Sequence, residues 1–144
     1  MGAFDNKVAY ADYRDSNVRI SRPFIVTPVV DSVDTVATHN LFTIPDGFAL
    51  AGGSVIVTTS VTSAGAATVQ FTVDGDALTG AIGKADLAAG DVVSLEFGAT
   101  DGTTVTGAYA NGADTQFSMV VGTAALTAGK FTVILDLVHV DAIS

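Results

Sequence analysis

The stretch Ala67-Thr68-Val69-Gln70-Phe71-Thr72-Val73, followed by Asp74-Gly75-Asp76, decides the fold class. Its apolar side chains recur at every second position, and polar side chains stand between them. A period of two predicts an antiparallel strand with one buried face and one solvated face. An Asp-Gly pair is a strong signal for a two-residue hairpin turn. We therefore expect residues 77–82 to form the returning strand.

The same two-residue period continues on both sides of this hairpin. Further strand candidates are residues 24–30, 36–44, 54–62, 91–97, 115–121 and 130–141. About eight strands without helical crossovers predict an all-β fold, an antiparallel β-sandwich of the jelly-roll-like kind. Pro28 cannot donate a hydrogen bond to a neighbouring strand, so the first strand should lie at a sheet edge or break at this residue.

The chain of 144 residues divides into an extended N-terminal arm, residues 1–22, and a β-sandwich domain, residues 23–144. The arm holds four of the six basic side chains and only three of the fifteen acidic ones. It has no clear helix or strand period, and it brings aromatic and guanidinium groups together in one segment: Tyr10, Tyr13, Arg14, Arg19 and Arg22. Tyr and Arg are enriched in binding hot spots, so these five are the candidate partner-binding residues. Packing of the arm along its own domain or along a neighbouring copy is the alternative.

Composition excludes several classes of protein. A net charge of −9, with only six Lys and Arg, argues against nucleic-acid binding, because the neutralisation of phosphates needs clustered cations. Cysteine is absent, so there is no disulfide framework, thiolate metal site or thiol nucleophile. The uncharged stretch of residues 47–73 contains eight Ser or Thr residues in short alternating runs, which argues against a membrane span. The N-terminus lacks the apolar segment of a signal peptide, so we expect synthesis in a cytoplasm.

Catalytic and metal-binding patterns are missing from the sequence. His39 and His139 are far apart and have no metal-ligand spacing, so we expect both to be structural histidines on strands. The carboxylate pairs Asp74/Asp76 and Asp31/Asp34 are typical of solvated turns rather than of acid–base catalysis. There is no nucleophile elbow and no phosphate-binding loop. We predict no catalytic residue, no metal and no cofactor.

The C-terminal stretch Phe131-Thr-Val-Ile-Leu-Asp-Leu-Val-His-Val-Asp141 is apolar on both faces. One parity holds Phe131, Val133, Leu135 and Leu137, and the other holds Ile134, Val138 and Val140 around Asp136. A small antiparallel sandwich normally solvates one face, so the second face needs cover. The low charged fraction of 15% points the same way. We predict an oligomer with Ile134, Val138 and Val140 in its interface; cover by a loop or by the arm is the alternative.

Two loop patterns complete the sequence. Residues 98–116 are rich in Gly, Thr, Ala and Asp, which predicts an exposed loop, and Tyr109 within it is a candidate for stacking on a sugar. The segments 87–93 and 126–133 resemble each other, and each begins with a Leu. Each is expected to be a tight turn anchored by that Leu in the core, with a Gly at positive φ before a strand.

Three segments resemble the head decoration (cement) proteins of tailed bacteriophages. They are Arg22-Pro-Phe-Ile-Val-Thr-Pro-Val-Val-Asp31, Leu41-Phe-Thr-Ile-Pro45 and Val120-Val-Gly-Thr-Ala-Ala-Leu-Thr-Ala-Gly-Lys130. The similarity runs in patches over residues 20–141 and does not cover the arm at 1–19.

This resemblance implies a non-enzymatic structural protein of the virion. Such a protein binds the outside of an expanded capsid, commonly as a homotrimer, and clamps neighbouring major capsid protein subunits. A phage fibre or adhesin module that binds a surface glycan through residues 98–116 is the alternative from another class. A component of the tail or tail tube is a third.

Overall fold

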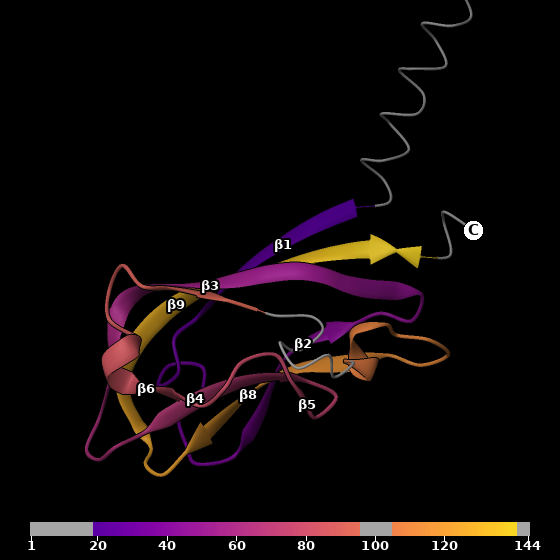
Figure 1. Cartoon of the computed structure of the whole chain (residues 1–144). Helices are drawn as coiled ribbons and strands as arrows, with labels where there is room; N and C mark the ends of the chain where they lie inside the picture. The colour runs from indigo at the N-terminus through magenta and orange to yellow at the C-terminus, as the bar shows by residue number, and fades with distance from the viewer. Residues whose placement is uncertain (1–18, 96–104, 141–144) are drawn as a thin grey trace, which may run out of the picture.

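The computed structural model describes residues 19–95 and 105–140, which form two layers of antiparallel strands (Figure 1). The strands are β1 (Arg19–Val26), β2 (Thr38–Ile44), β3 (Phe48–Ser63), β4 (Thr68–Val73), β5 (Asp76–Ala77), β6 (Ile82–Gly83), β7 (Val92–Ser94), β8 (Thr115–Gly122) and β9 (Leu126–His139). Two short 3-10 helices, η1 (Lys84–Asp86) and η2 (Thr106–Ala108), lie between strands.

The first sheet has the strand order β1-β9-β3-β7, and the second has the order β2-β8-β4-β5, with β6 also paired with β4. If β5 and β6 are taken as one interrupted strand, the eight consecutive strands alternate between the sheets except at the hairpin from β4 to β5, and the first lies beside the last. This is the connectivity of a jelly roll. The predicted fold class, an antiparallel β-sandwich of the jelly-roll kind, is confirmed.

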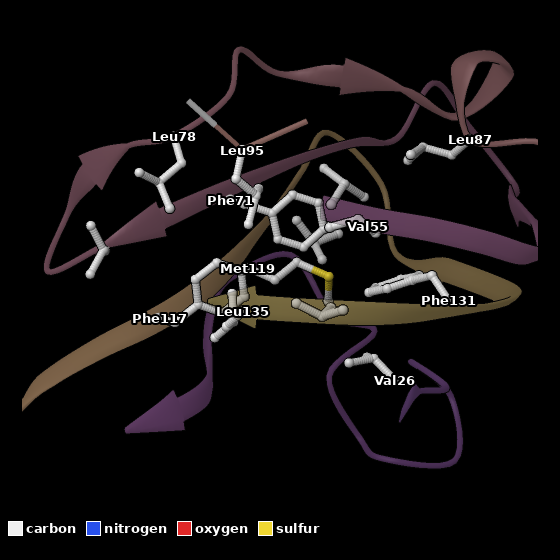
Figure 2. Packing of buried hydrophobic residues seen from close by; sticks show 14 of the residues in the cluster. Val26, Val55, Phe71, Leu78, Leu87, Leu95, Phe117, Met119, Phe131 and Leu135 are labelled. Carbon is white, nitrogen blue, oxygen red and sulfur yellow. The ribbon is translucent and has the colours of Figure 1, made fainter. Parts of the chain in front are cut away.

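The core lies between the two sheets and is built from the alternating residues that the sequence singled out. Phe71 on β4 stacks on Phe117 of β8 with ring centroids 5.9 Å apart, and it meets the edge of Phe131 from β9 at the same distance. Figure 2 shows these rings beside Met119 in the space between the layers. All four side chains are buried, and full burial stabilises by about 1.5–3 kcal/mol for each side chain of this size.

The Asp74-Gly75 hairpin between β4 and β5 is confirmed. Both residues have positive φ, 48° and 86°, which is the backbone of a type I′ turn. The Asp74 carboxylate accepts a hydrogen bond of 3.0 Å from the Gln116 backbone N–H, so it ties the turn to β8.

The continuous returning strand expected at residues 77–82 is wrong. Only the two-residue strands β5 and β6 form there. Between them Leu78 turns into the core, with 2% of its surface exposed. The Thr79 hydroxyl then takes the place of a strand carbonyl by accepting the Phe71 N–H at 3.2 Å, so the ladder is interrupted.

The first strand differs from its expected range of 24–30. β1 begins earlier, at Arg19, and ends at Val26, two residues before Pro28. The chain then turns, because Asp31 donates its N–H to the Thr27 carbonyl and accepts the Thr27 N–H on its carboxylate, both at 2.8 Å. β1 is an edge strand. The expectation that the strand lies at a sheet edge or breaks at Pro28 is therefore confirmed, and the expected limits of the strand were wrong.

Other strand limits also moved. β3 runs through Phe48–Ser63 rather than 54–62, because it pairs with β9 along almost its whole length. β7 covers Val92–Ser94 within the expected 91–97, of which residues 96 and 97 lie outside the described residues. The expected end of the arm at residue 22 falls inside β1, so its last four residues belong to the first sheet. Residues 1–18 of the arm lie outside the described residues.

The two similar segments both place a glycine against β3. Leu87 and Leu126 are buried, and Gly90 and Gly129 have positive φ, as expected. The first segment is a turn, in which the Gly90 N–H donates to the Val57 carbonyl at 2.8 Å. The second lies in β9 itself, where the register against β3 shifts. A Cβ on Gly129 would stand 2.9 Å from Val61 Cγ2, so this strand crossing requires glycine.

Candidate interaction surface

The outer face of the first sheet, called here the outer face, carries rows of side chains that point away from the core, and many of these side chains are apolar. Residues opposite each other on antiparallel strands share a face, so the register defines each row. One row crosses all four strands through Ile25, Thr132, Ile56 and Val92. The next row holds Pro23, Ile134, Ser54 and Ser94.

Both ends of the first row are open to solvent. Ile25 on β1 is 59% exposed and Val92 on β7 is 61% exposed, whereas Ile56 and Thr132 between them are half-buried. Exposed apolar side chains of this kind are common singly, but an aligned row across a sheet is typical of an interaction surface.

Two of the three predicted oligomer-interface residues lie on the outer face. Ile134 and Val138 alternate with the buried Val133, Leu135 and Leu137 along β9. Val140 follows the end of β9, and its N–H donates to the Gly47 carbonyl at 2.9 Å. All three predicted residues are half-buried rather than enclosed in the described part of the chain. Their part in an interface stays a prediction.

Ile25, Ile56 and Val92 were not predicted from the sequence. The available signal was a break in the two-residue period, with consecutive apolar residues in each of the four strands. These runs are Phe24-Ile25-Val26, Val55-Ile56-Val57, Val92-Val93 and Val133-Ile134-Leu135. The same signal was recognised only in β9, where further apolar residues follow the run on both sides of the strand.

The outer face of the described strands carries three charged side chains, all exposed: Arg19 on β1, and Asp136 and Lys130 on β9. Arg19 and Asp136 border a shallow hollow of about 290 Å³. It forms beside the register shift of β3 between Leu50 and Gly52. A Cβ on Gly52 would stand 3.3 Å from the Asp136 carboxylate, so glycine gives that side chain its space.

The predicted partner-binding residues are only in part described. Tyr10, Tyr13 and Arg14 lie outside the described residues. Arg19 and Arg22 are both exposed on β1. They stand three positions apart, so they point to opposite sides of that strand, Arg19 to the outer face and Arg22 to the other. The structure does not bring these two guanidinium groups together.

Three residues that were considered for catalysis or metal binding, His39, His139 and Asp76, contact other residues of the fold. His39 Nε2 on β2 lies 2.7 Å from the Thr35 carbonyl, and the His139 ring stacks on Phe48 with centroids 4.6 Å apart. Asp76 accepts the Gly107 N–H at 3.1 Å. Within residues 19–95 and 105–140, no group of three His, Cys, Asp or Glu side chains is placed to hold a metal ion. No helix in that part of the chain is long and apolar enough to cross a membrane.

Only residues 105–116 of the candidate glycan-binding loop are described. They pair with the start of β3, where Tyr109 forms an isolated β-bridge with Ala49. The Ala110 carbonyl accepts the Gly47 N–H at 2.7 Å, and the Ala110 N–H donates to the Phe48 carbonyl at 2.9 Å. The Tyr109 side chain is 36% exposed.

The loop between β1 and β2 is a further exposed apolar segment that was not predicted from the sequence. It exposes Val29, Val30 and Val36.

The fold and this surface define a jelly-roll β-sandwich whose outer face carries exposed apolar side chains. No family model matches the chain, and no curated protein matches its sequence. Among solved structures the chain is similar to one from the capsid of Ralstonia phage GP4, with 16% identity, a TM-score of 0.52 and 84% of each chain covered. It is also similar to a chain of the acidic stable capsid structure of Helicobacter pylori bacteriophage KHP30, with 13% identity, a TM-score of 0.49 and coverage of 85% of this chain and 89% of that one. The likeness to the GP4 chain shows a shared fold.

Proposed function

We propose that the chain is a non-enzymatic structural protein of a phage virion. It binds the outside of an expanded capsid and stabilises the capsid by clamping neighbouring major capsid protein subunits. The observation that carries this proposal is the jelly-roll fold shared with a chain of a phage capsid over 84% of both chains. The resemblance of residues 22–31, 41–45 and 120–130 to head decoration proteins supports the same role.

The arm is the proposed contact with the capsid, through Tyr10, Tyr13, Arg14, Arg19 and Arg22. Its last residues are fixed in β1, which pairs with β9 along the whole of Arg19–Val26. A binding segment joined to a rigid sheet edge is held near its target once the body has docked, which raises its effective concentration. Repetition over a symmetric shell multiplies such weak contacts.

Self-association is the second part of the proposal. Ile134, Val138 and Val140, together with Ile25, Ile56 and Val92, offer an apolar surface for a further copy. In the family that the sequence resembles, the oligomer is commonly a trimer. Native mass spectrometry of the full chain counts the copies.

Deletion of residues 1–18 tests the capsid contact and leaves β1 complete. We expect the shortened chain to keep the unfolding midpoint of the full chain and to stop co-sedimenting with expanded empty heads. The full chain carrying Tyr10→Ala, Tyr13→Ala and Arg14→Ala should lose binding in the same way. Unchanged sedimentation of both variants would refute the role of the arm.

Glycan binding is the second candidate, and it is favoured by the part-exposed side chain of Tyr109, whose backbone is paired with Ala49. A glycan array with the full chain and with Tyr109→Ala separates the two functions. A saccharide signal that the substitution removes would favour a recognition module. The decoration role predicts no saccharide signal from either protein.

A further inference from the structure

We infer that the outer face binds a second copy of this chain face to face, with the two β9 strands antiparallel, so that Asp136 of each copy meets Lys130 of the other. This inference rests on the proposed self-association and deepens it. It predicts a two-fold pair, rather than the trimer that the resemblance implies.

The order of charges along β9 carries the argument. Asp136 and Lys130 lie on the outer face at equal sequence distances from Val133, three residues to either side. Two rows lie between them: the largely apolar row of Thr132, and the row of Ile134, which also holds Pro23 and two serines. Along β9, the outer face thus presents a carboxylate on one side of the two rows and an ammonium group on the other.

Two stacked sheets can be related by a two-fold axis in the plane of contact in two ways. An axis across the strands at Val133 reverses one copy, so the row of Asp136 meets the row of Lys130, and the row of Ile134 meets the row of Thr132 and Ile56. An axis along the strands leaves the order of the rows unchanged. Each charged side chain then lies in the same row as the identical side chain of the other copy. Like charges in contact are unfavourable, so the charges select the reversed alignment.

The third charged residue of the outer face fits this alignment. Arg19 is paired with Val138, one row beyond Asp136. In the reversed pair that row meets the row of Ala128, which is uncharged. Arg19 therefore meets no like charge on the other copy.

The sheet edges favour contact through the face. An edge strand offers unpaired N–H and C=O groups to another chain unless it is short, contains proline or is bulged. β1 contains Pro23, β2 has a register shift between Asn40 and Phe42, and β7 has three residues. All three of these edges are poor templates for pairing with a second sheet.

Charge reversal with compensation tests the inference on the full chain. The proteins are the parent, Asp136→Lys, Lys130→Asp and the double variant Asp136→Lys/Lys130→Asp. Sedimentation equilibrium gives the copy number and dissociation constant, and urea unfolding confirms that each protein folds. Asp86→Lys is the matched control, because Asp86 is an exposed carboxylate in η1, which is not one of the strands that form the outer face.

We expect a pair for the parent, a dissociation constant raised at least tenfold in each single variant, and a return to within threefold of the parent in the double variant. Asp86→Lys should match the parent. A monomeric parent, an oligomer unaffected by the single reversals, or a double variant no better than the singles would each overturn the inference.

Co-sedimentation with expanded empty heads, measured on the same proteins, separates this inference from the proposed function. A parent that pairs as described but does not bind heads contradicts the proposed function alone. A parent that binds heads as a monomer contradicts the inference alone. Single reversals that abolish head binding without changing the copy number would overturn the inference and assign the outer face to the capsid protein.

Discussion

Phe24 on β1 and Phe42 on β2 stack with ring centroids 5.7 Å apart and ring planes 11° apart. β1 and β2 are edge strands of different sheets, so this contact joins the two layers where each sheet ends. Phe24 also meets the edge of Phe117, with centroids 6.4 Å apart. One half-buried aromatic ring thus closes one side of the sandwich and extends the buried aromatic cluster.

Phe24→Ala should therefore lower the free energy of unfolding by about 2–3 kcal/mol, at the low end for an aromatic truncation because the ring is only half-buried. Urea unfolding measures this loss. Ile25→Ala is the matched control one residue along the strand. Its side chain is 59% exposed, so the cost should stay below about 1 kcal/mol at concentrations where the chain is monomeric. Equal costs would mean that Phe24 does not close the sandwich.

Gly53 on β3 is expected to be intolerant of any side chain. A Cβ there would stand 2.8 Å from Leu95 Cδ1 and 2.9 Å from the Ile134 carbonyl oxygen. Gly53→Ala should cost about 1–3 kcal/mol by overpacking, measured by urea unfolding. At Gly83, on β6, a Cβ meets nothing within 4 Å, so Gly83→Ala should change stability by less than about 0.5 kcal/mol. A harmless alanine at position 53 would show that β3 and β9 separate easily.

The Asp74-Gly75 turn should depend on backbone conformation rather than on space. Gly75 has φ +86°, and a Cβ added there would meet nothing within 4 Å, so Gly75→Ala should cost about 1–2 kcal/mol through strain alone. Gly80→Ala, in an equally open position without positive φ, should be neutral. Thermal unfolding of the two variants compares them directly. A Gly75→Ala protein as stable as Gly80→Ala would contradict the type I′ turn.

The fold was largely predictable because its signals are local. The alternation in Val69, Phe71 and Val73 requires only a period of two, and the Asp74-Gly75 turn requires only residues that accept positive φ. The break after Val26 follows from Pro28, which has no N–H. In contrast, the interruption between β5 and β6 depends on a hydrogen bond from the Phe71 N–H to the Thr79 hydroxyl, and no local sequence pattern predicts this bond.

The interaction surface was predictable only in part, because it depends on register. Ile134 and Val138 were visible within one strand, as apolar residues on the second face of β9. Ile25, Ile56 and Val92 are separated by more than thirty residues from one another, and only the pairing of four strands sets them in one row. The separation of Asp136 from Lys130 by the rows of Ile134 and Thr132 likewise follows only from the pairing of β9 with its neighbours.

Sedimentation equilibrium on the full chain and on the triple variant Ile25→Ser/Val92→Ser/Ile134→Ser tests the central claim, that the outer face joins copies of this protein. We expect an oligomer for the parent and single chains for the variant, with unfolding of the isolated variant still cooperative because all three side chains lie outside the core. A parent that remains a single chain at all concentrations, or a variant that assembles as well as the parent, would contradict it.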